Sequence, residues 1–227
     1  MLDDINRVYR QARNIHEGVF GSITIGYPGS ISYGFLQTLI TNITQTLPEL
    51  KVELVEPTDI SFEQLLLNYE MDIAFRRDPA ENPALQSINL YSEHFSLIVP
   101  KHHHLNEQNF KRLEDVKEEK FILSGLHHKT IYVDSLRQIF HDYGFIPKIH
   151  IESDFGGIIL SLVARGLGIS ILPSSYSFNA SPDIRFINLP YQVSLYVIWR
   201  KDNSSPVLKN VLKQVHQVAS KFVIDQK

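Results

Sequence analysis

Residues 156–173 read GGIILSLVARGLGISILP, and no other stretch says more about the fold. A helix that crosses a membrane needs about 20 apolar residues, so this stretch is long enough to raise that interpretation. Arg165 near its middle and the glycines at 166 and 168 argue against it, because a charge is costly inside a bilayer. We interpret the stretch as a buried helix, a glycine turn and a buried strand.

Helical and extended patterns alternate on both sides of this stretch. Apolar residues recur every three to four positions in some segments and every second position in others, which are the periods of helices and strands. Such alternation indicates an α/β fold with largely parallel sheets. We expect strands at residues 22–27, 50–56, 72–75, 95–99, 121–123, 148–152, 169–172 and 193–199. We expect helices at residues 3–16, 62–70, 133–143, 157–164 and 207–223, and one that opens at Ser30.

The composition excludes several classes of protein. The chain has 227 residues, with 22 Lys and Arg against 25 Asp and Glu, so it lacks the basic excess of a nucleic-acid-binding surface. It has no cysteine, which excludes disulfides, thiolate catalysis and Cys-ligated metals. Its first residues, MLDD, have neither the basic nor the apolar region of a signal peptide. We therefore expect a cytoplasmic protein.

The junction between the first strand and the next helix reads GYPGSIS, residues 26–32. In open α/β sheets, ligands bind at the carboxyl ends of strands, where helix N-termini present free N–H groups. Ser30 stands where an N-cap residue would. Its hydroxyl could hold an anionic oxygen of a ligand, or it could simply cap its own helix.

Two arginines follow the short strand at 72–75. Placed at a carboxyl end, Arg76 or Arg77 could pair bidentately with a carboxylate. The alternative is a solvated loop, which the nearby Asp78 and Glu81 favour.

Histidines gather at residues 102–104 and 127–128. Adjacent histidines in a strand point to opposite faces, and no carboxylate or second histidine stands at ligand spacing. We therefore predict loop histidines and no metal site. We also expect no cofactor and no enzyme, because the chain has no G-x-S-x-G, P-loop or H-E-x-x-H motif.

Several segments resemble the effector-binding domain of LysR-type transcriptional regulators. The most specific is LVARGLGISILP at residues 162–173, which is similar to the family pattern LVAAGLGIALLP. Further matches are GSITIG at 21–26, MDIAF at 71–75, LIVP at 97–100 and YGFIP at 143–147. The resemblance covers about residues 18–224, and residues 1–17 look like the C-terminal part of the family's linker helix.

The resemblance implies a fold like that of type II periplasmic binding proteins, with two Rossmann-like α/β lobes joined by two crossover strands. Lobe I would comprise residues 18–93 and 194–227, and lobe II residues 94–193. A small effector would bind in the cleft between the lobes.

The resemblance also implies which residues bind the effector. Ser30 matches the residue that holds the effector's carboxylate, and Arg77 matches an arginine that pairs with carboxylates. The other residues implied in lobe I and at its junction are Ser32, Thr58, Asp59 and Phe75. The residues implied in lobe II are Ser124, Gly125, Thr130, Tyr132, Asp154 and Phe155. Tyr27, Phe75 and Tyr132 would form apolar walls, so we expect an organic acid or an aromatic carboxylate.

This sequence departs from the family at three points. Asp59 replaces the usual Ser or Thr, and would repel a second carboxylate unless Arg76 or Arg77 compensates. His104 replaces the proline of the common HPL turn. The family's N-terminal winged helix-turn-helix is not among these residues, so we expect a piece of a longer regulator.

We therefore expect the sensing domain of a transcription factor, a homodimer or tetramer that reaches DNA only through that missing module and contacts no membrane. We expect exposed apolar strips on helices 30–46 and 206–223, which are candidates for the interface. The alternatives are a solute-binding protein of a transporter, which has the same fold, and a small-molecule enzyme. The absence of a signal peptide and of a nucleophile–base pair counts against them.

Overall fold

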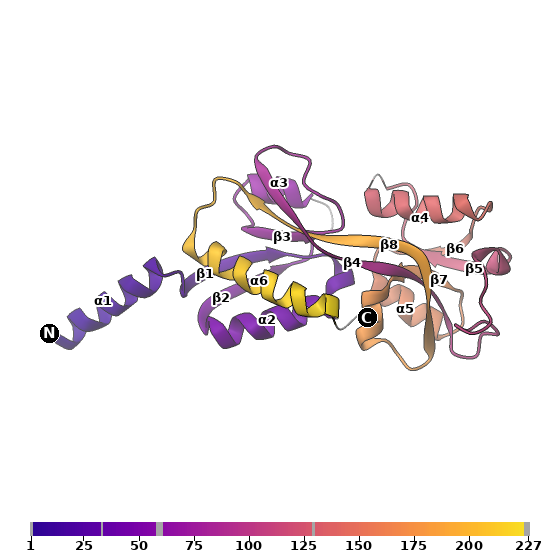
Figure 1. Ribbon diagram of the computed structural model, residues 1–227, viewed down its shortest axis with the longest axis horizontal. Coiled ribbons are helices and arrows are strands. Elements are labelled where there is room, and N and C mark those ends of the chain that lie inside the picture. Colours follow the sequence, from indigo (N-terminus) through magenta and orange to yellow (C-terminus); the bar gives the residue numbers. More distant parts are fainter. Residues whose placement is uncertain (1, 33, 58–60, 129, 225–227) are drawn as a thin grey trace. The chain divides into compact units, whose positions relative to one another are not determined.

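The computed structural model describes residues 2–32, 34–57, 61–128 and 130–224 (Figure 1). By their contacts these residues divide into two compact units. Unit 1 takes its described residues from 1–28, 35–91 and 195–227, and unit 2 from 29–34 and 92–194. Two long strands, β4 (Leu85–Pro100) and β8 (Ile184–Arg200), contain residues of both units.

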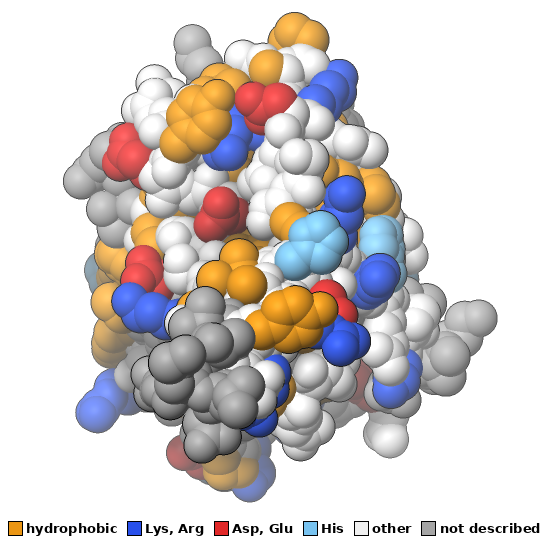
Figure 2. Space-filling view, turned by 90° about the vertical axis from the view of Figure 1, so that its left-hand side faces the viewer, with side chains coloured by type: hydrophobic (Ala, Val, Ile, Leu, Met, Phe, Trp, Pro, Cys, Tyr) orange, Lys and Arg blue, Asp and Glu red, His pale blue; other side chains and the backbone are white. Residues whose placement is uncertain are grey.

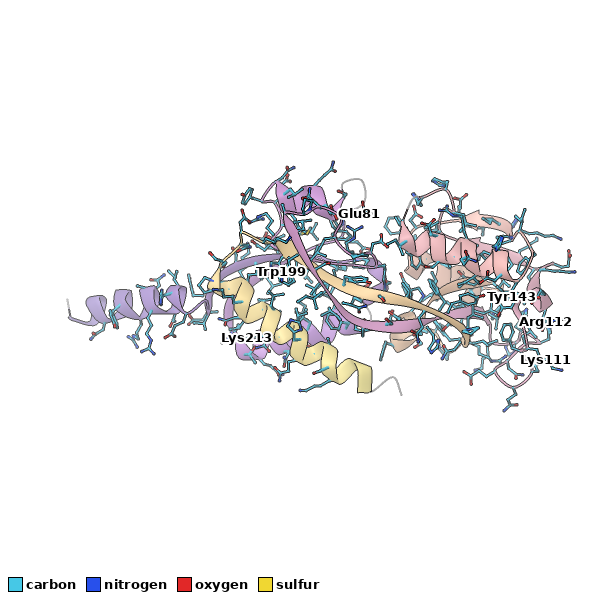
Figure 3. All side chains as sticks on the ribbon, turned by 45° about the horizontal axis from the view of Figure 1, so that its top comes forward. Glu81, Lys111, Arg112, Tyr143, Trp199 and Lys213 are labelled. Carbon is cyan, nitrogen blue, oxygen red and sulfur yellow. The ribbon has the colours of Figure 1, made fainter. Side chains whose placement is uncertain are left out.

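Unit 1 is built on parallel strands. Strand β1 (Phe20–Gly26) pairs in parallel with both β2 (Glu49–Val55) and β3 (Ile73–Arg76). Strand β3 in turn pairs antiparallel with β8, where Ile73 stands opposite Trp199, one of the residues labelled in Figure 3. The helices of this unit are α1 (Leu2–His16), α2 (Phe35–Thr46), α3 (Phe62–Leu67) and α6 (Pro206–Ile224).

Helices α2 and α6 lie side by side in unit 1 (Figure 1). Asn42 Nδ2 donates a hydrogen bond of 2.8 Å to Gln214 Oε1. Most apolar residues of α2 and of the described part of α6 are buried in the core, for example Leu39 and Val211 at 0% exposure. The prediction of exposed apolar strips on these two helices is therefore wrong, because the strips meet the unit's own core.

Unit 2 has the same kind of parallel pairing. Strand β5 (Lys120–Leu123) pairs in parallel with β6 (Lys148–Glu152), and Phe121 forms a parallel bridge with Ile169. Strand β7 (Ser170–Pro173) pairs antiparallel with β4. The helices are α4 (Ile131–Asp142) and α5 (Gly156–Ala164), with short 3-10 helices η1 (Gly29–Ile31), η2 (Leu113–Val116) and η3 (Ser174–Asn179).

The interpretation of residues 156–173 as helix, glycine turn and strand is confirmed. Helix α5 closes with Gly166 at φ +73° while the Leu167 N–H donates to the Leu162 carbonyl, which is a Schellman ending. A Cβ at Gly168 would lie 2.5 Å from the Lys120 carbonyl oxygen, so only glycine fits there. All four residues of β7 are buried.

None of the helices in the described part of the chain combines the length and the apolar character that crossing a bilayer requires.

The C-terminal end of α4 is fastened to β8 within unit 2. Tyr143, labelled in Figure 3, stacks edge-on against Tyr191 with ring centroids 6.2 Å apart. Tyr191 donates its hydroxyl proton to Asp142 at 2.9 Å. Burial and this carboxylate raise the pKa of Tyr191 to about 12, so the phenol remains a donor at any physiological pH.

The two strands that run through both units are longer than the sequence predicts. Residues 95–99 and 193–199 are only the apolar ends of β4 and β8. Along the remaining residues exposed positions interrupt buried and partly buried ones, and many of the side chains are polar. Their apolar signal is therefore weaker than that of the buried ends.

Candidate functional site

Ser30 lies in η1 and does not cap α2. The segment 29–31 forms a single 3-10 turn, and α2 begins only at Phe35. Ser30 is held through its backbone, since its carbonyl oxygen accepts a 2.9 Å hydrogen bond from Ser175 Oγ. The Ser32 hydroxyl donates to the Gly29 carbonyl. The predicted helix opening at Ser30 is therefore wrong, because a turn separates the serine from the helix.

The two arginines after β3 have different surroundings. Arg76 donates to Glu63 at 2.9 Å and to Asp78 at 3.3 Å. Arg77 is only 8% exposed, so the solvated-loop interpretation does not hold for it. A buried guanidinium attracts an anion more strongly than an exposed one, because the surrounding dielectric is lower.

The two aromatic candidates of unit 1 are enclosed to different degrees. Phe75 has 0% exposure, and its ring packs edge-to-face on Phe35 with centroids 5.3 Å apart, so it belongs to the core. Tyr27 is half-buried directly after β1. Burial raises the pKa of Tyr27, and the carboxylate of Glu56 raises it further. Thr58 and Asp59 lie outside the described residues.

Polar groups meet where β5 and β6 end in unit 2. Because the two strands are parallel, their carboxyl ends lie at the same edge. The Gly125 N–H donates a 3.2 Å hydrogen bond to Asp154 Oδ1. The neighbouring Ser124 hydroxyl is buried and has no hydrogen-bond partner among the described residues. The structure thus brings together Ser124, Gly125 and Asp154, three of the predicted residues.

His128, which the sequence predicts only to be a loop histidine, completes this group. His128 Nε2 donates to Asp154 Oδ2 at 3.1 Å, so both oxygens of the carboxylate are engaged. Beside it, His127 Nδ1 lies 3.4 Å from Glu152 Oε1, and the two histidine rings stack 4.3 Å apart. The only signal in the sequence was the His127–His128 pair, whose acidic partners lie at the end of β6 and just after it, more than twenty positions away.

The other three candidates of unit 2 have different surroundings. Thr130 caps α4, because its hydroxyl accepts a 3.1 Å hydrogen bond from the Val133 N–H. Tyr132 is half-buried and its ring lies 5.6 Å from that of Phe95. Phe155 precedes α5 and is 52% exposed. Of these three, Phe155 presents the largest free apolar surface.

A second histidine group has a carboxylate companion that the sequence did not predict. His103, His104 and Glu119 each offer a ligand atom, and these atoms lie within 4.8 Å of one another. However, His103 Nδ1 accepts a 3.2 Å hydrogen bond from the Leu105 N–H, which leaves the ring proton on Nε2, 3.4 Å from Glu119. In this tautomer neither ring nitrogen offers a free lone pair to a metal.

A cavity of about 420 Å³ lies in unit 2 between α5 and the chain that follows β7. Its lining includes Arg165 and Asp183 together with two serines, but none of the predicted residues. On the face that Figure 2 shows, Lys and Arg side chains are interspersed with Asp, Glu and apolar ones. This mixture agrees with the nearly balanced charge of the sequence.

Two α/β units with parallel strands and polar side chains at their carboxyl ends define a ligand-binding domain of the periplasmic-binding-protein type. The family model described as the LysR substrate binding domain matches residues 16–220. This chain therefore belongs to the LysR family, and it comprises the substrate-binding domain.

Named relatives agree with this assignment. The chain is 28% identical to the HTH-type transcriptional regulator AlsR of Bacillus subtilis (strain 168), over 93% of this chain and 71% of AlsR. It is 26% identical to the regulator BenM of Acinetobacter baylyi (strain ATCC 33305 / BD413 / ADP1), over 96% of this chain and 73% of BenM.

Solved structures show the same fold. The LysR family regulator CbnR superposes with a TM-score of 0.82 at 23% identity, covering 94% of this chain and 75% of CbnR. The effector-binding domain of BenM, solved with its effector benzoate, gives a TM-score of 0.75 at 26% identity, covering 88% and 92%. The predicted family and fold class are confirmed.

Proposed function

We propose that this domain senses a small organic carboxylate and controls DNA binding by a winged helix-turn-helix that is not among the 227 residues. The effector binds to residues of the predicted set, and the domain catalyses no reaction. Ligand binding acts by shifting the population of domain arrangements, since a ligand stabilises the state that it binds more tightly.

The observation that carries this proposal is the polar group at the carboxyl ends of β5 and β6. The buried Ser124 hydroxyl lacks a partner among the described residues, and an unpaired buried hydroxyl is costly unless a ligand or water satisfies it. Arg77 supports the carboxylate preference from unit 1, because it is a buried cation that directly follows β3. The benzoate complex of BenM supports an aromatic acid as the first ligand to test.

Isothermal titration of the chain with benzoate and a panel of small carboxylates tests the proposal. We expect Arg77→Gln and Ser124→Ala to weaken binding about 10- to 100-fold, as for the loss of a hydrogen bond to a charged group. Ser30→Ala tests the third predicted contact. Arg76→Gln is the matched control, because it removes the neighbouring arginine, which pairs with Glu63 and Asp78 and is not in the predicted set. Unchanged affinity in both Arg77→Gln and Ser124→Ala would refute the assigned site.

We further propose that the protein works in the cytoplasm as a homodimer or tetramer. Family membership supports oligomerisation, and CbnR has been solved in complex with its target DNA. Light scattering across a range of concentrations should show a species larger than one chain. A monomer at the highest concentration would contradict this part of the proposal.

A further inference from the structure

Glu93 is an acidic residue with almost no contact with solvent. It lies in β4 and is 1% exposed. Its Oε2 accepts hydrogen bonds from the Ser175 N–H at 2.5 Å and from the Ser174 hydroxyl at 3.1 Å. A buried carboxylate is stable only when donors satisfy it, so these contacts fix the start of η3 on β4.

The same serine continues the chain of hydrogen bonds to η1. Ser175 is 0% exposed, and its hydroxyl donates to the Ser30 carbonyl at 2.9 Å. Three segments that are far apart in the sequence are thus joined within unit 2. Segment 29–34 comes between β1 and α2, both in unit 1, yet its contacts place it in unit 2.

We propose that Glu93 and Ser175 are positioning residues that set the conformation of the described residues of segment 29–34, which are 29–32 and 34. The carboxylate fixes the Ser175 backbone, and the Ser175 hydroxyl then holds the Ser30 carbonyl. The orientation of the Ser30 and Ser32 side chains follows from this backbone anchor. The consequence for effector affinity rests on the proposed function, whereas the anchor itself does not.

Amide hydrogen exchange of the full chain without ligand tests the anchor. The Ser32 and Gly34 amides report on the segment, because they donate to the Gly29 and Ile31 carbonyls. We expect Ser175→Ala to speed their exchange about five- to tenfold, as for the loss of one buried hydrogen bond. Amides of β1, in unit 1, should keep the parent rates.

Two further variants separate positioning from a general loss of structure. Ser174→Ala removes a donor to Glu93 but leaves the hydrogen bond from Ser175 to Ser30. The Ser32 and Gly34 amides of this variant should therefore exchange at the parent rates. Glu93→Met should speed exchange at Ser32 and Gly34. Glu93→Gln should restore much of the protection, because its amide oxygen still accepts from the Ser175 N–H. Parent-like exchange in Ser175→Ala, or an equal rise across all of unit 2, would overturn the proposal.

A binding measurement addresses the consequence separately. With benzoate as the probe, Ser175→Ala should weaken binding by about the factor by which it speeds exchange, since both report the same displaced segment. Absence of benzoate binding to the parent chain would count against the proposed function alone, because the exchange result decides the anchor. Parent-like benzoate affinity combined with faster exchange would refute the effect on binding and leave the anchor supported.

Discussion

The guanidinium carbon of Arg200 lies 3.9 Å from the centroid of the Tyr69 ring. Arg200 is 9% exposed, and its Nη1 donates to the Leu66 carbonyl at 2.8 Å and the Met71 carbonyl at 3.3 Å. Tyr69 has φ +63°, a left-handed conformation that is unfavourable for a residue with a side chain. Arg200 thus stabilises the turn between α3 and β3, with the tyrosine ring above it.

Replacing Arg200 should therefore cost much more stability than replacing Tyr69. We expect Arg200→Met to lower the free energy of unfolding by about 2–3 kcal/mol, because two buried carbonyls lose a charged donor. Tyr69→Ala should cost about 1 kcal/mol or less, the usual value of a cation–π contact. Tyr69→Gly should be about 1 kcal/mol more stable than Tyr69→Ala, since glycine adopts the left-handed conformation freely. Urea denaturation measures the stability of all three variants. Equal stability of Tyr69→Ala and Tyr69→Gly would contradict the backbone strain that we infer at Tyr69.

Replacing either glycine of the LVARGLG segment, Gly166 or Gly168, should destabilise the protein, but for different physical reasons. Gly168→Ala should cost roughly 3 kcal/mol, because the new methyl group overlaps the Lys120 carbonyl that pairs with Ile169. Gly166→Ala meets no atom within 4 Å and should cost only about 1–2 kcal/mol of backbone strain. Gly166→Asn should be milder still, since asparagine tolerates this conformation. A larger loss for Gly166→Ala than for Gly168→Ala would refute the explanation.

Replacing Thr130 should mainly change the stability of the protein. Thr130→Ala removes the N-cap of α4 and should lower the free energy of unfolding by about 1 kcal/mol. Thr130→Ser keeps the hydroxyl oxygen and should remain within a few tenths of the parent, because serine is an equally good cap. Thermal unfolding followed by circular dichroism measures both variants. A parent-like Thr130→Ala would contradict the capping role.

His103 should make the protein less stable in mild acid. Burial lowers the pKa of His103 below its ordinary value of 6.5; the nearby His104 and Arg185 lower it further, while Glu119 acts in the opposite direction. As the pH falls below 6.5, the unfolded chain takes up this proton before the folded chain does. The free energy of unfolding therefore decreases until the pH reaches the folded-state pKa.

Urea midpoints at pH 7.5 and 5.5 check this dependence. The loss of stability between the two values should be smaller in His103→Gln than in the parent chain, because glutamine does not titrate. His102→Gln in the same exposed loop is the control and should follow the parent. An identical loss in His103→Gln and the parent would show that other groups cause the acid sensitivity.

Much of the fold could be predicted from the sequence because its signals are local. The helix, the Gly166 turn and the buried strand of residues 156–173 depend on residues within one segment and on the backbone freedom of glycine. The same holds for the alternation of strands and helices. Where the apolar pattern was diluted, as along β4, the sequence identified only the buried end of the strand.

The candidate site was only partly predictable, for the opposite reason. Ser124, Gly125 and Asp154 follow strands that pair in parallel, so the general rule about carboxyl ends brought them together. The sequence did not predict that His128 joins this group, because His128 follows β5 whereas its partner Asp154 follows β6. The predicted helix opening at Ser30 is wrong because a serine after a turn looks the same in the sequence whether a helix or a 3-10 turn follows.

By itself, the sequence determined the α/β class, the family pattern and the residues with chemistry to offer, since periodicity, turn residues and motifs are properties of neighbouring positions. Only the tertiary structure decided what those residues do. It buried Arg77 and left Arg76 to pair with Glu63, it set Glu119 beside His103, and it joined Ser30 to Ser175. The physical reason is that burial and hydrogen bonding depend on which distant segments pack together, and no local pattern encodes that choice.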